Sequence, residues 1–493
     1  MGFTGCRTKC EEGSSAWPEC AEGDATPPPN TRTLWVWNLH DPKDAFTGQF
    51  QAFPNVVPGI EPGLNVEYRQ FTNPYEYEKL LMSEIAQGQG PAVFAIDPSW
   101  LTKYPDLFAP MPVDLLSDIP AGAETDTTDP TAKLDAIFFP IVREHLTRDG
   151  DVYALPMYVD TLALYFNSNI FSNAIFNSIT DNKPAETWEG IKEQTKEMTE
   201  KDKSIERFRL TAIALGRADN IRLAADIVKM LFLQHGAALF DSQAGNAIIA
   251  EAQGTVSGTG REYFPGIEAM KLFTGFADAT NITYNWNRLI TALYPQLDEI
   301  GAFARGKTAM IFGYSSTYND IVATIEGLSK NRVDTIKVED IDVAPAPQLD
   351  GFGSEGQVAL GKMYPFAVNK NLLNTRPILV DDGWQLIKYL TTDPEVVRGY
   401  QRQTRKPSAL RSLNPEQQSE QLYGVFARQV PFADLVDVIS PEDFERILQN
   451  ALKELEIQEL EESVMPAMQA RLQCLFDQSI DQRQDTDCPS IRP

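Results

Sequence analysis

In the first hundred residues, short apolar runs alternate with segments whose apolar residues recur at helical spacing. Residues 33–37 (TLWVW) and 64–68 (LNVEY) have the length and composition of strands, and so does the apolar run at 91–96. Between the second and third runs, residues 75–87 place apolar side chains at helical spacing. This strand–helix–strand order predicts an α/β domain with a largely parallel sheet.

Polar and aromatic side chains come directly after these predicted strands. Asn38 follows the first strand, and Asp97 and Trp100 follow the third. Ligand sites of parallel sheets collect at the carboxyl ends of the strands. We therefore expect these three residues near a ligand site.

Later parts of the chain show mostly helical patterns. Residues 205–300 carry helical spacing, and 288–300 (RLITALYPQLDEI) predicts one helix that Pro295 would kink. Residues 441–477 are also predicted to be helical, with the acidic side chains between 454 and 462 on a solvated face. Residues 120–131 read as a polar loop.

One short stretch, GAFARGKTAM at 301–310, matches the G-x-x-x-x-G-K-[ST] pattern of phosphate-binding loops. A phosphate loop needs a strand before the glycines and a helix after them, so that N–H groups at the helix start converge on the phosphates. Here a predicted helix precedes the loop and the apolar run 309–312 follows it. We therefore predict a helix-to-strand connection rather than a nucleotide site.

Composition excludes several classes of partner. The chain has 493 residues, with 43 Lys+Arg against 69 Asp+Glu, for a net charge of −26. Such a charge repels nucleic acid and anionic membrane surfaces. None of the three histidines stands in a metal-ligand spacing such as H-E-x-x-H, so we expect neither a metal nor another cofactor.

All five cysteines lie near the ends of the chain. Close pairs predict two local disulfides, Cys10–Cys20 and Cys474–Cys488, in an oxidising compartment. Cys6 is left over, and its context FTGC resembles the lipidation site of bacterial lipoproteins. We expect a lipidated Cys6 that anchors the chain to a membrane, with a disulfide partner or a free thiol as the alternatives.

Several motifs together resemble the extracellular solute-binding proteins of ABC importers, in the group that binds maltodextrins and other sugars. They are GDVYALP at 150–156 with Asp160 and LYFN at 164–167, PAETWE at 184–189, FARGKTAM at 303–310, WQLIKYLTTDPE at 384–395 and RKPSA at 405–409. No single motif is specific, and their order along residues 33–475 carries the resemblance. Within it, Thr187 caps a helix, Trp188 packs beneath that helix, Gly306 allows the turn and Met310 lies in the core.

The resemblance implies a two-lobed α/β fold of the periplasmic-binding-protein type, with the ligand between the lobes. The hinge would be crossed near residues 149, 362 and 404. The expected parts are a tether at 1–32, a first lobe at 33–149 and 363–403, a second lobe at 150–362 and 404–475, and a tail at 476–493. The resemblance also implies an extracytoplasmic monomer that delivers its solute to a membrane permease.

A sugar pocket needs aromatic platforms and planar polar partners. The family-like positions at strand ends predict these ligand-binding residues: Trp37, Asn38, Asp97, Trp100, Asp160, Tyr314, Tyr318, Tyr364 and Phe432. The alternative role of each aromatic residue is packing in the core. The alternative role of each carboxylate is to cap a helix or to accept a hydrogen bond within a loop. The loop after Trp37 has no family counterpart, so His40 and Asp41 receive no role.

Other functions stay open at this point. Two carboxylates also suit a cationic solute such as a polyamine, although the aromatics favour a sugar. Asp97 and Asp160 are the two acids that a glycoside hydrolase would need on either side of one bond. No catalytic residue is predicted, because the resemblance is to binding proteins. A surface lipoprotein without a transport role is the third possibility.

Overall fold

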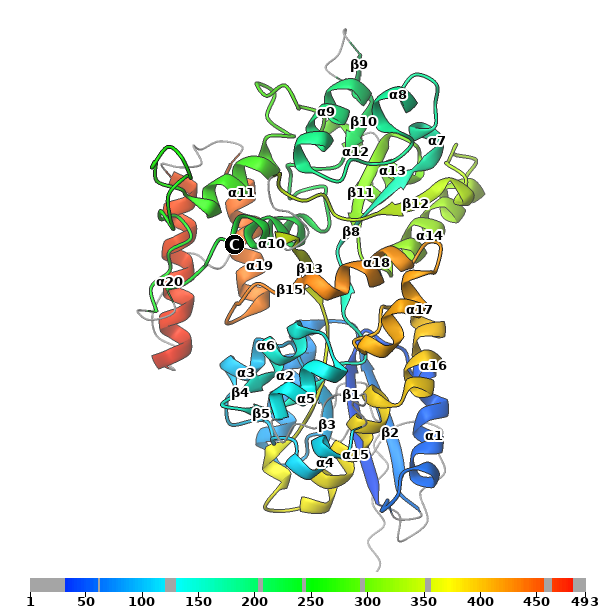
Figure 1. The fold of residues 1–493 in the computed structure, drawn as a ribbon, viewed down its shortest axis with the longest axis vertical. Helices are drawn as coiled ribbons and strands as arrows, with labels where there is room; N and C mark the ends of the chain where they lie inside the picture. The colour runs from blue at the N-terminus through cyan, green and yellow to red at the C-terminus, as the bar shows by residue number, and fades with distance from the viewer. Residues whose placement is uncertain are drawn as a thin grey trace, which may run out of the picture.

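Two five-stranded sheets divide the molecule into two lobes that lie one above the other (Figure 1). The computed structural model describes residues 32–60, 63–119, 130–202, 207–241, 245–292, 298–350, 356–455 and 463–481. Each sheet has its own cluster of buried apolar side chains. The predicted two-lobed α/β architecture is confirmed.

The first sheet has the order β2-β1-β3-β14-β6. Its strands are β1 (Thr33–Leu39), β2 (Asn65–Phe71), β3 (Val93–Ala95), β6 (Ala154–Leu155) and β14 (Phe366–Val368). β1 pairs in parallel with both β2 and β3, whereas β14 runs antiparallel to β3 and β6. The three strands predicted before residue 97 are therefore present, and the carboxyl ends of β1 and β3 reach the same edge.

Helices and a small hairpin complete the first lobe. They are α1 (Thr47–Val56), α2 (Pro74–Ala86), α3 (Trp100–Lys103), α4 (Val113–Ser117), α5 (Pro130–Ile137), α6 (Pro140–Leu146), β4 (Thr147–Arg148), β5 (Asp151–Val152), α15 (Pro377–Thr392) and α16 (Pro394–Thr404), with 3-10 turns η1 (Lys43–Ala45), η4 (Lys370–Leu372) and η5 (Arg411–Leu413). The lobe thus joins the first 150 residues to a segment from the last third of the chain (Figure 1).

The second sheet has the order β12-β8-β11-β10-β9. Its strands are β8 (Ala163–Asn167), β9 (Glu200–Asp202), β10 (Arg207–Ile213), β11 (Thr308–Gly313) and β12 (Ile341–Ala344). β8 lies between β12 and β11 and is buried along its whole length, which explains its continuous apolar sequence ALYF.

The second lobe carries most of the helices. They are α7 (Ser168–Phe171), α8 (Asn177–Thr180), α9 (Trp188–Met198), α10 (Ala224–His235), α11 (Pro265–Thr274), α12 (Leu289–Ala292), α13 (Glu299–Ala304), α14 (Thr317–Lys330), α17 (Asn414–Gln418), α18 (Gly424–Gln429), α19 (Pro441–Glu454) and α20 (Met465–Asp481), with 3-10 turns η2 (Val338–Asp340) and η6 (Val430–Phe432). α19 and α20 pack beside α10 and α11 on one flank (Figure 1).

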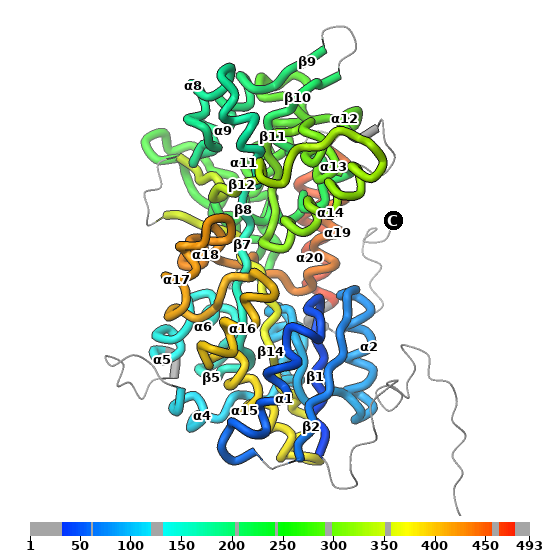
Figure 2. The backbone as a smooth tube through the Cα atoms, turned by 90° about the vertical axis from the view of Figure 1, so that its right-hand side faces the viewer, coloured from blue at the N-terminus to red at the C-terminus, as the bar shows by residue number. Residues whose placement is uncertain are grey.

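A third sheet, β15-β13-β7, lies where the chain passes between the lobes. Its strands are β7 (Asp160–Thr161), β13 (Ala359–Lys362) and β15 (Ala433–Asp434). In the side view, β7 and α16 to α18 lie at the level between the two lobes (Figure 2). β6, at residues 154–155, pairs with β14 in the first sheet. The lobe bounds and the crossings near residues 149, 362 and 404 stay predictions.

The loop that resembles a phosphate cradle joins α13 to β11, as the sequence predicts. Gly306 has φ 63°, a left-handed conformation that favours glycine, and Met310 is fully buried. The single helix predicted at 288–300 is wrong, because Asp298 has an extended backbone with φ −90° and ψ −167°, and α13 begins after it at Glu299. The Asp298 side chain accepts from the N–H of Gly301 at 3.1 Å and so starts a separate helix.

Two further details bear on the sequence predictions. Thr187 accepts from the N–H of Gly190 at 3.3 Å and caps α9, and Trp188 is buried, as predicted. Cys474 takes part in a disulfide, whereas Cys6, Cys10, Cys20 and Cys488 lie outside the described residues, so both pairings and the lipidation stay predictions. Among the described helices, none combines the length and the apolar character that crossing a membrane requires.

Candidate functional site

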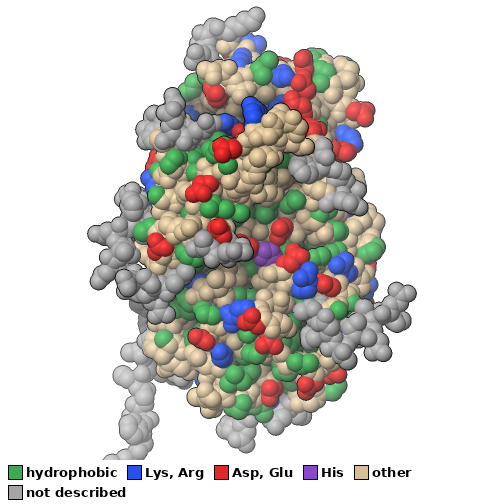
Figure 3. Space-filling model, turned by 60° about the vertical axis from the view of Figure 1, so that its left-hand side comes forward, with side chains coloured by type: hydrophobic (Ala, Val, Ile, Leu, Met, Phe, Trp, Pro, Cys, Tyr) green, Lys and Arg blue, Asp and Glu red, His purple; other side chains and the backbone are tan. Residues whose placement is uncertain are grey.

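A cleft of about 670 Å³ opens between the lobes. Its lining includes the end of β3 and the start of α3 from the first lobe, α10 and α19 from the second lobe, and the segment around β13 and β15. Figure 3 shows acidic side chains and histidine around a hollow at mid-height of one face. Aromatic and charged side chains both contribute to the walls.

Asp97 stands at the carboxyl end of β3, on the first-lobe wall. Its Oδ1 accepts from the N–H of Ser99 at 3.0 Å and from the hydroxyl of Ser99 at 2.7 Å, which turns the chain into α3. Burial raises the pKa of Asp97, and the hydrogen bonds from Ser99 oppose this only in part. No ion pair to Asp97 occurs among the residues that the structure describes.

Trp100 lies next to it and is 2% exposed. Its ring stacks on Tyr77, with the ring centroids 6.0 Å apart, and Tyr77 is held by a 2.6 Å hydrogen bond from its hydroxyl to the carbonyl oxygen of Ala95. The indole N–H of Trp100 has no hydrogen-bond partner within the described part of the chain. A buried donor of this kind costs free energy unless a ligand or water accepts from it.

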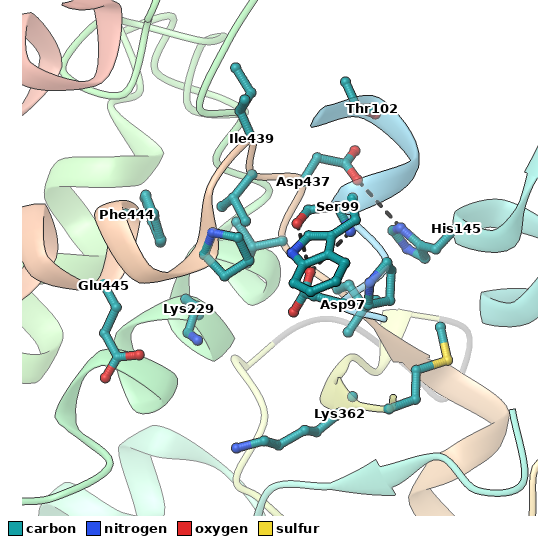
Figure 4. Close-up of a pocket in the computed structure, with 18 of the residues that line it drawn as sticks. Asp97, Ser99, Thr102, His145, Lys229, Lys362, Asp437, Ile439, Phe444 and Glu445 are labelled. Atoms are coloured by element: carbon teal, nitrogen blue, oxygen red, sulfur yellow. Dashed lines mark hydrogen bonds and ion pairs between the residues drawn. The ribbon is translucent and has the colours of Figure 1, made fainter. Parts of the chain in front are cut away.

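The second-lobe wall is charged, but its charges are paired with each other. Lys229 and Asp226 on α10 form an ion pair. Burial opposes ionisation of Asp226, yet Lys229 and Lys362 outweigh it and lower the pKa of this carboxyl. The ammonium of Lys362 lies 4.8 Å from the centre of the Tyr314 ring (Figure 4 draws both lysines).

Glu442, at the start of α19, is the exception on this side. Its Oε2 is buried without a hydrogen-bond partner in the described ranges. Burial raises the pKa of Glu442 to about 7, and the charges of Glu78 and Asp97 add to this effect. This carboxyl group is therefore only partly ionised at neutral pH.

His145, from α6, connects the first lobe to the strand and loop after η6. Its Nε2 lies 2.8 Å from Asp434 Oδ1, and its Nδ1 lies 3.4 Å from Asp437 Oδ1 (Figure 4). Burial disfavours the charged ring, but hydrogen bonds with the two carboxylates outweigh it and raise the pKa of His145 to about 9. Glu144, His145 and Asp434 are spaced closely enough for a metal ion, yet a ring that holds its proton this firmly favours an ion-pair role.

Four of the predicted ligand residues line this cleft. They are Asp97, Trp100, Tyr314 and Tyr364. The structure brings them together although their positions span more than half of the chain. Their contact with a ligand stays a prediction.

The other five predicted residues lie outside the lining. Trp37 is 1% exposed and packs on Phe71 at a centroid distance of 5.1 Å, and Asn38 accepts from the N–H of Leu39 at 2.7 Å. Tyr318 packs edge-on against Tyr423, and Phe432 lies in the turn η6.

Asp160, the fifth, is 3% exposed and lies in β7 between the lobes. Its carboxylate accepts from the hydroxyl of Ser315 at 2.7 Å, from the N–H of Ser315 at 3.2 Å and from the N–H of Thr161 at 2.9 Å. The hydrolase alternative needs Asp97 and Asp160 on either side of one bond. Their placement does not provide that pair, since Asp160 does not line the cleft.

His40 and Asp41 also belong to the region between the lobes. Asp41 is 5% exposed, with Oδ1 2.5 Å from the ammonium of Lys406 and Oδ2 2.8 Å from the hydroxyl of Tyr400. Burial, with the charges of Lys362 and Lys406, lowers the pKa of His40 to about 4. The ring of His40 lies 5.4 Å from that of Tyr364.

Several cleft residues escaped the sequence analysis. Lys229 and Glu442 belong to segments that were predicted as helix, and Lys362 stands at a predicted crossing of the hinge. The contact of His145 with Asp434 joins positions 289 residues apart. A weak signal existed only for Lys362.

The profile of the family described as bacterial extracellular solute-binding protein matches residues 44–396. A comparison with curated proteins finds no match.

Solved structures of similar fold cover nearly the whole chain. A sugar-binding protein, MalE, from Xanthomonas citri has a TM-score of 0.64 at 15% identity, covering 92% of this chain and 100% of its own. An ABC transporter solute-binding protein from Thermotoga lettingae with bound α-D-tagatose has a TM-score of 0.62 at 17% identity, covering 90% and 100%. A substrate-binding protein from Listeria monocytogenes in complex with cycloalternan has a TM-score of 0.62 at 12% identity, covering 91% and 100%.

Proposed function

Because the chain belongs to the bacterial extracellular solute-binding protein family, we propose that it binds a sugar or oligosaccharide between its lobes and delivers it to the permease of an ABC importer. Family membership places the protein outside the cytoplasmic membrane. The cleft of about 670 Å³, with walls from both lobes, is the observation that carries the proposal. Such a volume is typical of small-molecule sites.

The chemistry of the walls favours a sugar. Trp100, Tyr314, Tyr364 and Phe444 line the cleft with aromatic rings, and Asp97 and Ser99 line it with polar groups. Aromatic faces pack on the C–H faces of sugar rings, while the polar groups recognise hydroxyls. The structural neighbours with bound tagatose and cycloalternan are consistent with this class of solute.

Closure would be a hinge motion at the sheet β15-β13-β7. Ligand contacts with both walls would favour the closed arrangement, because a ligand stabilises the state to which it binds more tightly. We propose a monomer that is held at the membrane by a lipid on Cys6 and that carries out no chemistry on its solute. The family and the neighbouring structures are binding proteins.

A thermal-shift screen of the purified chain tests the function. The panel contains monosaccharides, neutral oligosaccharides, amino sugars, spermidine and short peptides. A ligand at about a hundred times its dissociation constant adds roughly 2.7 kcal/mol, which raises Tm by a few degrees. We expect one sugar class to raise Tm and to be recovered intact. Recovery of a cleaved sugar, or no shift with any sugar, would contradict the proposal.

A further inference from the structure

The charges of the cleft are unevenly neutralised. On the second-lobe side, Lys229 and Lys362 both act on Asp226, and Glu445 lies close enough to Lys229 to raise its pKa further. In Figure 4, Lys229 and Lys362 lie on the second-lobe and hinge side of the pocket, with Glu445 beside Lys229. This group of two cations and two anions balances itself.

Two carboxyl groups of the cleft form no ion pair among the described residues, although the charges of Lys229 and Lys362 act on Asp97 and that of Lys103 acts on Glu442 without direct contact. Asp97 accepts hydrogen bonds only from Ser99, and Glu442 has a buried oxygen without any partner. They belong to opposite lobes, at the end of β3 and at the start of α19. When both are ionised, their negative charges repel each other, and burial raises the pKa of both groups.

Closure of the lobes would bring this like-charged pair further out of water. Burying carboxylates without an opposite charge is costly, and the cost falls when a cation lies between them. An acidic solute would add a third negative charge at this place. A neutral solute would leave the repulsion in place.

Trp100 provides independent evidence for a ligand at the same place. It is 2% exposed, lines the cleft beside Asp97, and its indole N–H has no partner in the described residues. A sugar oxygen would accept this hydrogen bond. The stacked rings of Trp100 and Tyr77 also provide an aromatic surface of the kind that attracts cations.

We infer, resting on the proposed function, that the solute is an amino sugar, with its protonated amine between Asp97 and Glu442 and a sugar oxygen accepting from the indole N–H of Trp100. The amine would give both carboxyl groups the direct ion-pair partner that neither has among the described residues. Asp226 and Lys229 shape the wall and already satisfy each other.

The test compares matched ligands by calorimetric titration of the full chain at neutral pH. The ligands are glucosamine oligosaccharides, the same oligosaccharides in N-acetylated form, maltooligosaccharides and spermidine. N-acetylation removes the positive charge and keeps most of the sugar. We expect the free amine to bind at least about tenfold more tightly than its acetylated form.

Variants connect this preference to the two carboxyl groups. Asp97→Asn and Glu442→Gln should each reduce the preference for the amine to less than about threefold. Glu326→Gln, on the exposed face of α14 and outside the cleft, should leave the preference unchanged. Circular dichroism and Tm of each variant check that it is folded.

Each result decides something different. Equal binding of amino, acetylated and neutral sugars would overturn this inference and leave sugar binding standing. Binding of spermidine with no sugar would overturn both. An amine preference that persists in both Asp97→Asn and Glu442→Gln would show that other groups hold the amine.

Discussion

Asp97, which is half-buried, and Asp160, which is buried, were both predicted as sugar contacts, yet they lie in different environments. Asp160, between the lobes, has three donors within 3.2 Å from Ser315 and Thr161. Asp97, in the cleft, has only the donors of Ser99, two residues away. The comparison teaches that the region between the lobes satisfies its polar groups internally, whereas the first-lobe wall of the cleft leaves groups for a ligand.

The largest expected effect is on stability and comes from Asp160→Ala. This change leaves the N–H groups of Thr161 and Ser315 and the Ser315 hydroxyl without their acceptor. We expect a loss of about 3–5 kcal/mol in the free energy of unfolding, measured by urea denaturation. The same substitution at Asp97 should cost only about 1 kcal/mol, since it removes only the two local hydrogen bonds from Ser99. Equal losses at the two positions would remove the distinction.

Lys406, between the lobes, and Lys362, in the cleft, allow the same comparison of the two regions. Lys406→Met leaves the carboxylate of Asp41 buried with only the hydroxyl of Tyr400 as a side-chain donor, and should cost about 2–4 kcal/mol. Lys362→Met, in the cleft, breaks no ion pair among the described residues and should cost less than about 1 kcal/mol. Denaturant midpoints at constant m-value would measure both, and a larger loss for Lys362→Met would contradict the account.

The contact of His145 with Asp434 and Asp437 should make the free energy of unfolding depend on pH. The pKa of about 9 in the folded protein lies above the usual value near 6.5. Its stabilisation is therefore complete below about pH 6.5 and is lost as the pH rises through about 9. We expect about 1–2 kcal/mol, less than the full shift implies, because Asp437 is 94% exposed and water screens the pair.

His145→Gln serves as the matched variant for that prediction. Between pH 6 and 9.5, its unfolding free energy should fall less steeply than that of the unmodified chain. Parallel pH profiles would show that the contact with Asp434 and Asp437 contributes nothing.

The smallest expected change in stability concerns two of the buried tryptophans, Trp37 and Trp100. Trp37 and Trp100 both have an indole N–H without a partner in the described part of the chain, but only Trp100 lines the cleft. Trp100→Phe should alter stability by less than about 1 kcal/mol and weaken sugar binding about fivefold. Trp37→Phe should leave affinity unchanged, so a similar loss of affinity in both variants would be evidence against the assignment.

The features that were predicted correctly from the sequence are those that depend on residues close together in the chain. The runs at 33–37 and 64–68, the cap at Thr187 and the connection at Gly306 each depend on residues close in the chain, and the structure has them. The split of the helix at 288–300 was missed because Asp298 reads as an ordinary polar position until its side chain is seen to cap α13.

The residues of the cleft could be predicted only in part, because many of them come together through contacts between distant segments. Asp97 and Trp100 follow directly from the end of β3, so the sheet rule found them. Glu442 and the pairing of His145 with Asp434 come from contacts between distant segments, which no local pattern specifies. Asp160 has the residue type and the strand position of a ligand contact, and its hydrogen-bond partners and its place outside the cleft lining distinguish it from Asp97.

The most direct test of the account is calorimetric titration of the purified chain with the sugar that the thermal-shift screen identifies, repeated with Asp97→Asn and Trp100→Phe. The account predicts saturable binding of one sugar per chain, with weaker affinity and nearly unchanged unfolding in both variants. Full affinity in both variants, or no saturable binding of any sugar, would contradict a sugar site in this cleft.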